Sequence, residues 1–483
     1  MIIGRENESA VLQSLLAREE SQFAVVYGRR RVGKTYLIRE TFHYQFTFHH
    51  TGLAETGKKC QLVSFRDSLR AQGLPKCTTP KTWLEAFGML KELISEAPSG
   101  KKVIFIDELP WMDTPKSNMI SALENFWNGW ATARPEKDIV LIVCGSATSW
   151  ITKKLLKNKK GLRGRITEKI KLNPFSLAEC ERYAAAANLG MERKDILETY
   201  MILGGIPYYW SFLSRGKSVC QNIDALFFAE NAKLSDEFEA LYTTLFKRPE
   251  NYLTVISALS KRKAGLTREE ILKETGLSDG GTFSTMLQEL EQCGFVRCYF
   301  PLDRKKEGGI FQLMDNYTLF YFHCIRKNAF SDEHYWSNTY LSGEHNAWCG
   351  LAFERVCLQH AGCLKQALGI SGIITNICSW QTPKTDAHPG AQVDLVFKRA
   401  DNVINLFEMK YSDGVFTIDS KYARALLDKI ATFKQVTRTR LAVHPVMVTT
   451  YGIAPNGNRN ILQNDLTMDC LFACQGKPSE VLS

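Results

Sequence analysis

The sequence lacks a Cys-x-x-Cys pair among its 14 cysteines and lacks an apolar run long enough to cross a bilayer. Zinc sites usually need two close pairs of ligands, and the closest spacing here, Cys470 with Cys474, has no partner pair. The apolar stretch Ile139–Cys144 is far shorter than the ~20 residues that span a membrane. The N-terminal segment MIIGRENESA is charged almost at once, unlike a signal peptide. We therefore expect a cytoplasmic protein without a membrane partner, whose cysteines mostly pack in its core.

The length and the charge distribution restrict the architecture. A chain of 483 residues is too long for one ordinary core, so two to four domains are expected. The net charge of +10 is unevenly distributed along the chain. One short stretch contains nine basic residues and a single acidic residue, Glu168. Such a run can contact phosphates of nucleic acid or nucleotide, or it can form a solvated helix face. The basic residues are Lys153, Lys154, Lys157, Lys159, Lys160, Arg163, Arg165, Lys169 and Lys171.

A glycine-bounded loop follows the first apolar segment of the chain. Residues 22–27 (QFAVVY) suit a buried parallel strand, and helix-forming residues follow Lys34. Two glycines allow the loop N–H groups to point at phosphates, while Lys34 supplies charge to the β- and γ-phosphates and Thr35 a hydroxyl ligand for magnesium. We predict a P-loop that binds ATP with Mg²⁺. It consists of Gly28, Arg29, Arg30, Arg31, Val32, Gly33, Lys34 and Thr35.

A second apolar segment ends in two carboxylates. Residues 103–108 read VIFIDE, and the four apolar residues predict a buried strand. Asp107, at its carboxyl end, is placed to hold Mg²⁺, and Glu108 is placed to orient or deprotonate the attacking water. An acidic turn at a strand end is the plainer interpretation. The P-loop upstream favours the catalytic one.

Three further features have both a functional and a structural interpretation. Ser146 follows the apolar segment 139–144, where it could sense the γ-phosphate or belong to a strand-end turn. Pro207, in GGIP, could pack on an adenine ring or begin a helix after a tight turn. Arg163 and Arg165, in GLRGRIT, could reach phosphates of the same chain or of a neighbour, because the guanidinium fork suits that contact.

The order of these motifs resembles the archaeal-type ATPase family, within the AAA+/STAND group of P-loop switch ATPases. The resemblance covers roughly the first half of the chain. It implies that Arg5 and Glu6 lie near the adenine and that Pro207 matches the lid proline of STAND proteins. The resemblance implies an ATPase but does not indicate which process its ATP hydrolysis serves. The segments that carry it are IIGRENE, VVYGRRRVGKTYLI, VIFIDELPWM, VCGSA, LRGRITEKIKLNPFS and GGIPYY.

The middle of the chain predicts three helices and a strand pair. The helices are expected at YLTVISALS, LTREEILKETGL and GTFSTMLQELEQCGF, and the strands at VRCYF and GIFQLM. This order is that of a winged helix–turn–helix. Its third helix carries Gln288 and Gln292 beside Glu289 and Glu291, with no Lys or Arg, although reading base edges favours basic or amide groups. Packing between domains is therefore preferred over DNA binding. The wing alone offers positive charge, at Arg304, Lys305 and Lys306.

The C-terminal part places charged side chains on otherwise apolar elements. Glu354 shares a helical face with Leu351 and Leu358, and a carboxylate there needs a partner. In residues 392–398 (QVDLVFK) the alternation puts Asp394 on the face opposite Val393, Leu395 and Phe397. In the next strand, VINLFEMKYS, Glu408 and Lys410 share a face because the side-chain period is two.

These four residues are expected to converge at the ends of adjacent strands. Asp394 and Glu408 suit magnesium as hard oxygen ligands, and Lys410 can position the attacking water or lower its pKa. This is the chemistry of phosphodiester hydrolysis, with Glu354 as the fourth member. A sheet whose charges are merely solvated is the alternative. On the next helix Lys421, Arg424, Lys429 and Lys434 could line a DNA groove or form an ordinary wet face.

The spacing of an Asp and a later Glu-x-Lys resembles the PD-(D/E)xK restriction-endonuclease superfamily, although Val393 stands where the motif's name has proline. The order of parts is similar to a C-terminal domain of unknown function that commonly follows archaeal-type ATPase modules. We therefore expect an α/β fold with a P-loop NTPase core in residues 1–170 and a helical lid in 171–245. A winged helix–turn–helix in 246–315 and a restriction-endonuclease-like α/β domain in 316–483 follow.

The expected function is an ATP-binding and ATP-hydrolysing switch that controls a metal-dependent nuclease-like module, in defence or mobile-element biology. Double-stranded DNA is the expected partner, and a protein partner or a second copy of the chain is a further candidate. The alternative is a regulator that does not cut, in which ATP state controls binding of DNA or a protein and the nuclease-like fold is a scaffold. A third interpretation is slow hydrolysis, with ATP as a structural ligand.

Overall fold

The computed structural model describes residues 2–157, 161–162, 164–246, 248–302, 308–327, 332–386 and 388–473. The chain divides into two units, Met1–Asn173 and Pro174–Ser483. Within the described ranges, no helix is both long enough and apolar enough to pass through a bilayer. Arg163, Cys474 and the basic wing at Arg304, Lys305 and Lys306 lie outside the described residues, as do Lys159 and Lys160, so the interpretations placed on them stay predictions.

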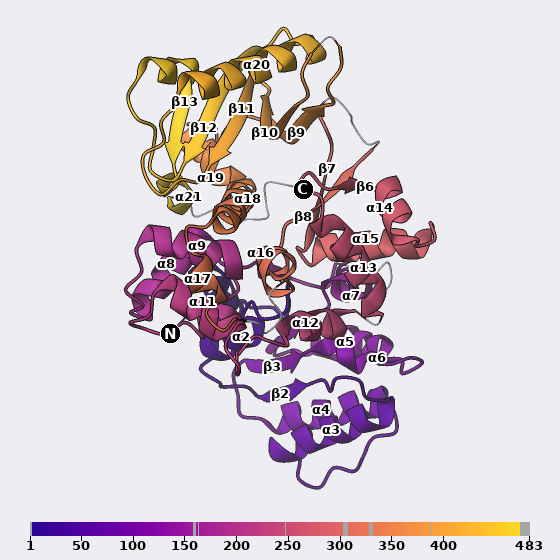
Figure 1. Ribbon diagram of the computed structural model, residues 1–483. Coiled ribbons are helices and arrows are strands. Elements are labelled where there is room, and N and C mark those ends of the chain that lie inside the picture. The colour runs from indigo at the N-terminus through magenta and orange to yellow at the C-terminus, as the bar shows by residue number, and fades with distance from the viewer. Residues whose placement is uncertain are drawn as a thin grey trace. The chain divides into compact units, whose positions relative to one another are not determined.

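The first unit is an α/β layer structure around a five-stranded parallel sheet, with strand order β2-β3-β4-β1-β5 (Figure 1). Its central strands are nearly continuous apolar runs, because in this arrangement both faces of a strand are covered. This is the parallel sheet typical of P-loop ATPases, and it confirms the predicted fold class of this part. The strands are β1 (Gln22–Tyr27), β2 (Phe48–Thr51), β3 (Lys102–Asp107), β4 (Ile139–Gly145) and β5 (Glu168–Lys171).

One face of this sheet carries an aromatic core. Phe23 of β1 packs on Trp127, and Phe65, Trp83 and Phe87 form a chain of ring contacts between helices α3 and α4. The carboxyl ends of the parallel strands meet at one edge, where loops can gather polar groups. The helices are α1 (Glu6–Ala17), α2 (Lys34–Thr41), α3 (Lys58–Ala71), α4 (Trp83–Glu96), α5 (Leu109–Met112), α6 (Met119–Phe126) and α7 (Thr148–Ile151), with π-helical turns η1 (Trp127–Ala131) and η2 (Thr152–Leu156).

The second unit begins with helices that are joined by a later segment of the chain. Asn316 donates to the carbonyl of Tyr200 over 2.6 Å, and Asp224 accepts the N–H of Trp336 over 2.8 Å. Residues 316–327 and 332–339 therefore pack with the helices of residues 177–245. These elements are α8 (Leu177–Ala186), α9 (Arg193–Leu203), α10 (Pro207–Trp210), α11 (Val219–Phe227), α12 (Glu237–Leu245), α16 (Asn316–Phe320), η3 (Tyr321–Ile325) and α17 (Tyr335–Thr339).

Between α12 and α16 the chain forms three helices and a small antiparallel sheet of order β6-β8-β7. The expected helices and strand pair are present. At Gly265 the backbone has φ +88°, and a Cβ there would lie 2.3 Å from the carbonyl oxygen of Phe311, so only glycine lets β6 approach β8. We call these elements the three-helix segment: α13 (Pro249–Ser260), β6 (Leu266–Thr267), α14 (Arg268–Thr275), α15 (Gly281–Gln292), β7 (Val296–Tyr299) and β8 (Ile310–Leu313).

The chain ends in a mixed five-stranded sheet of order β13-β12-β11-β10-β9, with α20 across one face and α18 on the other (Figure 1). β9, β10 and β11 are antiparallel neighbours, whereas β12 and β13 run parallel to β11. The elements are α18 (Gly343–Gln359), α19 (Ala361–Ala367), β9 (Thr375–Thr382), β10 (Ala391–Arg399), β11 (Val403–Lys410), α20 (Ser420–Thr437), β12 (Ala442–Thr449), η4 (Gly457–Ile461), β13 (Asn464–Thr467) and α21 (Asp469–Phe472).

The predicted alternation along β10 is wrong at Val393, which was expected to share a face with Leu395 and Phe397. The pairing with β9 shifts between Val393 and Val396, and these two valines pack in the same apolar cluster. A β-bulge inserts one extra residue into a strand and changes which face the following side chains take. Leu395, Val396 and Phe397 are all buried, because helices cover both faces of this sheet.

Candidate functional site

The loop between β1 and α2 has the backbone of a phosphate cradle. Gly28 has φ +151°, and a Cβ there would lie 2.1 Å from the carbonyl oxygen of Leu172. Gly33 has φ +89° with open space around it, and α2 begins at Lys34. Arg31 also takes a left-handed conformation, with φ +70°. The loop therefore takes a positive φ at three positions directly before a helix N-terminus, where anions bind.

The side chain of Lys34 points back into this loop. It is buried, and its Nζ donates to the carbonyl oxygens of Gly28 over 3.1 Å and Arg29 over 2.9 Å. These contacts hold a buried ammonium inside the cradle, where it can meet phosphate oxygens.

Asp107 joins the loop to the end of β3. Thr35 Oγ1 donates to Asp107 Oδ2 over 2.9 Å, which brings the two expected magnesium ligands together. The other oxygen, Oδ1, accepts from the Cys144 thiol over 2.6 Å and from the Glu108 N–H over 2.9 Å. Sequence reasoning did not foresee Cys144, since a buried cysteine in an apolar strand carries no local sign of a polar role.

Glu108 follows in a strained conformation. Its φ of +46° is left-handed, and its Oε2 accepts from both the N–H and the hydroxyl of Ser146, each over 3.1 Å. Burial raises the pKa of Glu108, and the nearby Lys34 and the Ser146 bonds only partly oppose that shift. Strain outside glycine often marks a functional position. Ser146 therefore contacts the expected catalytic carboxylate, which is a different contact from the one predicted for it.

The other nucleotide-site predictions lie in varied surroundings. Arg5 is buried and donates to the carbonyl of Asn173 over 2.6 Å. Pro207 occupies the first turn of α10, as its structural interpretation expected, and its place beside the adenine stays a prediction. Arg165 and the described lysines of the basic run are exposed.

The C-terminal sheet holds a second polar site, in a cavity of about 470 Å³ lined by Glu354, Asp394, Glu408 and Lys410. Leu395 pairs with Phe407 in the antiparallel register, so one further step places Asp394 across from Glu408. Directly opposed residues of an antiparallel pair share a face. The structure therefore gathers the four predicted residues, from α18, β10 and β11, around one cavity.

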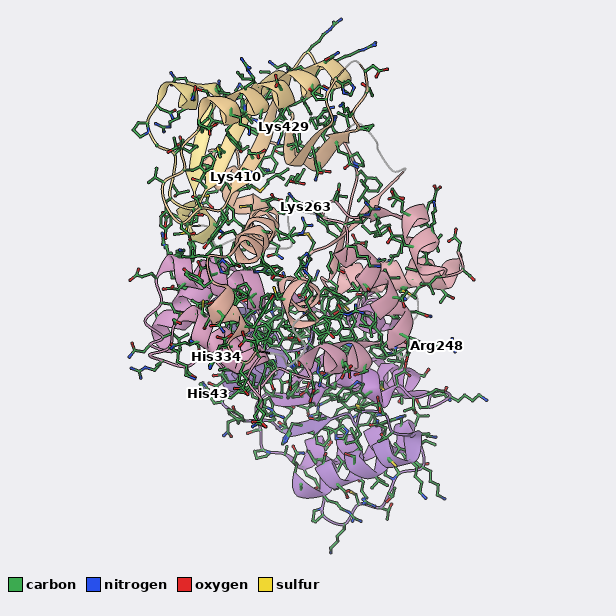
Figure 2. The ribbon with its side chains drawn as sticks, in the orientation of Figure 1. His43, Arg248, Lys263, His334, Lys410 and Lys429 are labelled. Carbon is green, nitrogen blue, oxygen red and sulfur yellow. The ribbon has the colours of Figure 1, made fainter. Side chains whose placement is uncertain are left out.

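Two lysines that sequence reasoning did not assign to the site, both labelled in Figure 2, pair with its carboxylates. Lys263 Nζ lies 2.7 Å from Glu354 Oε2 and 3.5 Å from Asp394 Oδ2. Lys429 of α20 donates to Glu408 Oε2 over 2.7 Å, whereas Lys410 lies 3.6 Å from Glu408 Oε1. Lys429 was expected only on a DNA groove or a wet face.

Neighbouring groups set the proton affinity of these acids. Burial and the charge of Asp394 raise the pKa of Glu354, against the opposing effect of Lys263. Burial alone would raise the pKa of Asp394, but Lys263, the Gln392 amide and Arg355 together lower it. The Gln392 amide donates to Asp394 Oδ1 over 2.6 Å, and Tyr422 donates to Glu408 Oε1 over 3.0 Å.

The carboxylates of this site are suitable ligands for a hard cation. In the structure, however, they do not lie close enough together to bind one ion jointly. Within the part of the chain that the structure describes, no three His, Cys, Asp or Glu side chains lie close enough to share a metal ion. Carboxylate oxygens are the ligands that magnesium prefers. Here each of the three carboxylates faces a lysine ammonium instead.

In the comparison with known proteins, the first part of the chain matches a family model. Residues 3–211 match the family described as "ATPase domain predominantly from Archaea". One relative, uncharacterized protein MJECL04 of Methanocaldococcus jannaschii, is 24% identical over 425 residues, which cover 86% of this chain and 88% of that protein.

Solved structures show a distant likeness. The Walker-type ATPase PABY2304 of Pyrococcus abyssi aligns with a TM-score of 0.45 at 17% identity, covering 66% of this chain and 95% of that one. The Aeropyrum pernix ORC2 protein, in ADPNP–ADP complexes, aligns with a TM-score of 0.39 at 15% identity, covering 64% and 89%.

Proposed function

We propose that this protein is an ATP-driven switch whose nucleotide state controls a nuclease-like module directed at DNA. Its premise is that the protein is an ATPase: residues 3–211 match an ATPase family, and a P-loop follows β1 of a parallel sheet. The nucleotide roles of single residues, the metal, the C-terminal activity and DNA belong to the proposal.

In the ATPase site, the loop from Gly28 to Thr35 would bind the phosphates, with Lys34 neutralising their charge. Thr35 and Asp107 would hold Mg²⁺, and their 2.9 Å contact supports this because it pairs two oxygen ligands beside the cradle. Magnesium would supply charge neutralisation at the phosphates. Glu108 would accept a proton from the attacking water, and its raised pKa makes it a stronger base than an exposed glutamate.

The C-terminal module would hydrolyse phosphodiesters at the cavity of Glu354, Asp394, Glu408 and Lys410. The single observation that carries this proposal is the pairing register, which brings Asp394 opposite Glu408 with Lys410 on the same strand. Asp394 and Glu408 would hold a divalent ion, which supplies Lewis acidity when bound. Lys410 would orient the nucleophilic water.

The three-helix segment is proposed to be a winged helix–turn–helix used to pack domains. Helix α15 exposes no lysine or arginine for bases, and the carboxylates of Glu289 and Glu291 bind Tyr252 Oη and the Cys298 N–H within the segment. The loop that precedes β6 reaches the C-terminal cavity through Lys263. Its contacts therefore support packing over base reading.

An endonuclease assay tests the C-terminal proposal. Purified protein is incubated with double-stranded DNA, Mg²⁺ and ATP, beside Asp394→Ala and Lys410→Ala. We expect cutting that is lost in both variants, because each removes a group in direct reach of the phosphate. Cutting that survives both substitutions would exclude this site. Parallel ATPase measurements with Lys34→Ala and Glu108→Gln report whether cutting depends on nucleotide binding or on turnover.

A regulator that does not cut is the second candidate. The observation that favours it is the position of Lys263, whose ammonium pairs with Asp394, a proposed ligand of the divalent ion, and with the neighbouring Glu354. Nucleotide-dependent DNA binding without any cleavage, in the same assay, would support this candidate over the first.

A further inference from the structure

The loop between α13 and β6 delivers a lysine into the cavity of the C-terminal sheet. Lys263 Nζ donates to Glu354 Oε1 over 2.9 Å, in addition to its ion pairs with Glu354 Oε2 and Asp394 Oδ2. Glu354 lies on α18 and Asp394 on β10. Neither residue belongs to the three-helix segment that carries the lysine. One ammonium therefore bridges two carboxylates from two different elements.

The backbone of this loop is held in place by several independent contacts. Gln312 Nε2 donates to the Lys263 carbonyl over 2.7 Å, and the buried Arg355 donates to the same oxygen. Tyr299 Oη donates to the next carbonyl, that of Ala264, over 2.6 Å. The glycine at 265 then lies against β8. Since the backbone is fixed, the lysine arm starts from a defined point beside the cavity.

The arm itself is only lightly packed. The Lys263 side chain is 45% exposed, against 15% for Glu354 and 18% for Asp394. Lysine has a long flexible stem, so its ammonium can leave the carboxylates without opening an apolar core. The carboxylates cannot leave as easily, because they are largely buried on α18 and β10.

We infer that Lys263 is an internal counter-ion that competes with a divalent cation for Glu354 and Asp394, so that the three-helix segment closes the C-terminal site. A divalent ion and the ammonium need the same carboxylate oxygens, and both cannot hold them together. Withdrawal of the arm leaves two adjacent carboxylates without the ammonium that bridges them, which favours a divalent ion. This inference rests on the proposed function in assigning Asp394 to a metal site, and it adds Glu354 to the ligands of that site.

Binding of Mn²⁺ without nucleotide, followed by the electron paramagnetic resonance signal of the unbound ion, tests the inference on the full chain. We expect Lys263→Met to bind Mn²⁺ at least tenfold more tightly than the parent. The double variant Lys263→Met with Asp394→Asn is expected to lose that gain. Lys263→Arg keeps a cation that can pair with both carboxylates, so it should behave like the parent.

Lys261→Met is the matched control, because it removes the same charge from an exposed lysine two residues away. Should the methionine variant fail to fold, Lys263→Gln, which keeps a donor toward Glu354, is titrated in its place. No gain in affinity on removing the Lys263 charge, or a gain that persists with Asp394→Asn, would overturn the inference. A variant that gains the ion but cuts no DNA would support it and contradict the nuclease proposal.

Discussion

Ser146 donates two hydrogen bonds to a single carboxylate oxygen of Glu108, one from its N–H and one from its hydroxyl, each 3.1 Å long. The two residues follow β4 and β3, which are neighbours in the parallel sheet. The contact connects the end of one strand to the expected base at the end of the other. It also opposes the effect of burial, which raises the pKa of Glu108.

The pH dependence of ATP turnover should report this contact. A base with a raised pKa becomes protonated at a higher pH than an exposed glutamate, so kcat should fall on the acid side earlier than usual. Ser146→Ala removes one bond that lowers the pKa and should move this limb upward, by up to about one pH unit. Ser149→Ala on α7 is the control. An unchanged acid limb in Ser146→Ala would contradict the role given to the hydroxyl.

Cys144 should set how well the ATPase uses magnesium. Its thiol donates to Asp107 Oδ1 over 2.6 Å, while Thr35 holds the other oxygen. Cys144→Ala leaves Oδ1 with one donor fewer, and we expect the Mg²⁺ concentration at half-maximal turnover to rise about threefold to tenfold. Cys144→Ser restores a donor of similar size and should recover most of the loss. The measurement is a Mg²⁺ titration at saturating ATP, and equal curves for alanine and serine would exclude a hydrogen-bonding role.

Gly28 should not tolerate a side chain, because its Cβ would lie 2.1 Å from the Leu172 carbonyl oxygen. We expect Gly28→Ala to destabilise the first unit by about 1–3 kcal/mol or more and to impair ATP binding. Gly57→Ala is the matched control, since a Cβ there meets open space and φ is −79°. Thermal unfolding and nucleotide titration measure the two effects. Equal stability of both variants would mean that the loop can move away from Leu172.

Stability should fall in mild acid through His360. This ring is fully buried, its Nδ1 contacts the Val356 carbonyl and its Nε2 accepts the Leu177 N–H, and burial lowers its pKa to about 4. The unfolded chain takes up a proton near pH 6.5 that the folded state refuses until about pH 4. The free energy of unfolding should therefore decrease over that window, by at most about 3 kcal/mol.

His360→Gln should flatten this dependence, and the exposed His334→Gln should leave it unchanged. Urea denaturation at several pH values between the two limits measures the slope. Burial also lowers the pKa of His50 to about 4, and His50 lies in the first unit. A spectroscopic probe in the second unit is therefore needed to separate the effect of His360 from that of His50. A slope in that unit that is identical in His360→Gln and the parent would contradict the assignment.

The candidate ATPase site could be predicted because its parts are local. A glycine-bounded loop, its lysine and its threonine are contiguous, and the apolar run before Asp107 predicts a buried strand ending in a carboxylate. Parallel strands bring their carboxyl ends together, so Lys34, Asp107 and Ser146 had to be neighbours once β1, β3 and β4 were neighbours. The hydrogen bond from Cys144 to Asp107 could not be predicted, because it depends on β4 lying beside β3 in the sheet.

Local sequence spacing predicts only part of the C-terminal cluster. Period-two spacing places Glu408 and Lys410 on one face, and an antiparallel neighbour brings Asp394 opposite. The bulge after Val393 was not predictable, since residues 391–398 contain no glycine or other local sign of a bulge. Lys429 was not predictable either, because a lysine on an amphipathic helix is more often solvated than inserted.

The sequence by itself determined the ATPase chemistry and the residue types of the second cavity, because short-range spacing and strand periodicity decide which side chains a local element presents. Only the tertiary structure decided which charges balance those carboxylates. Lys263 lies far from both Glu354 and Asp394 along the chain, and its pairing depends on how the three-helix segment packs against α18 and β10. A Coulomb contact depends on distance in space, which separation in sequence does not set.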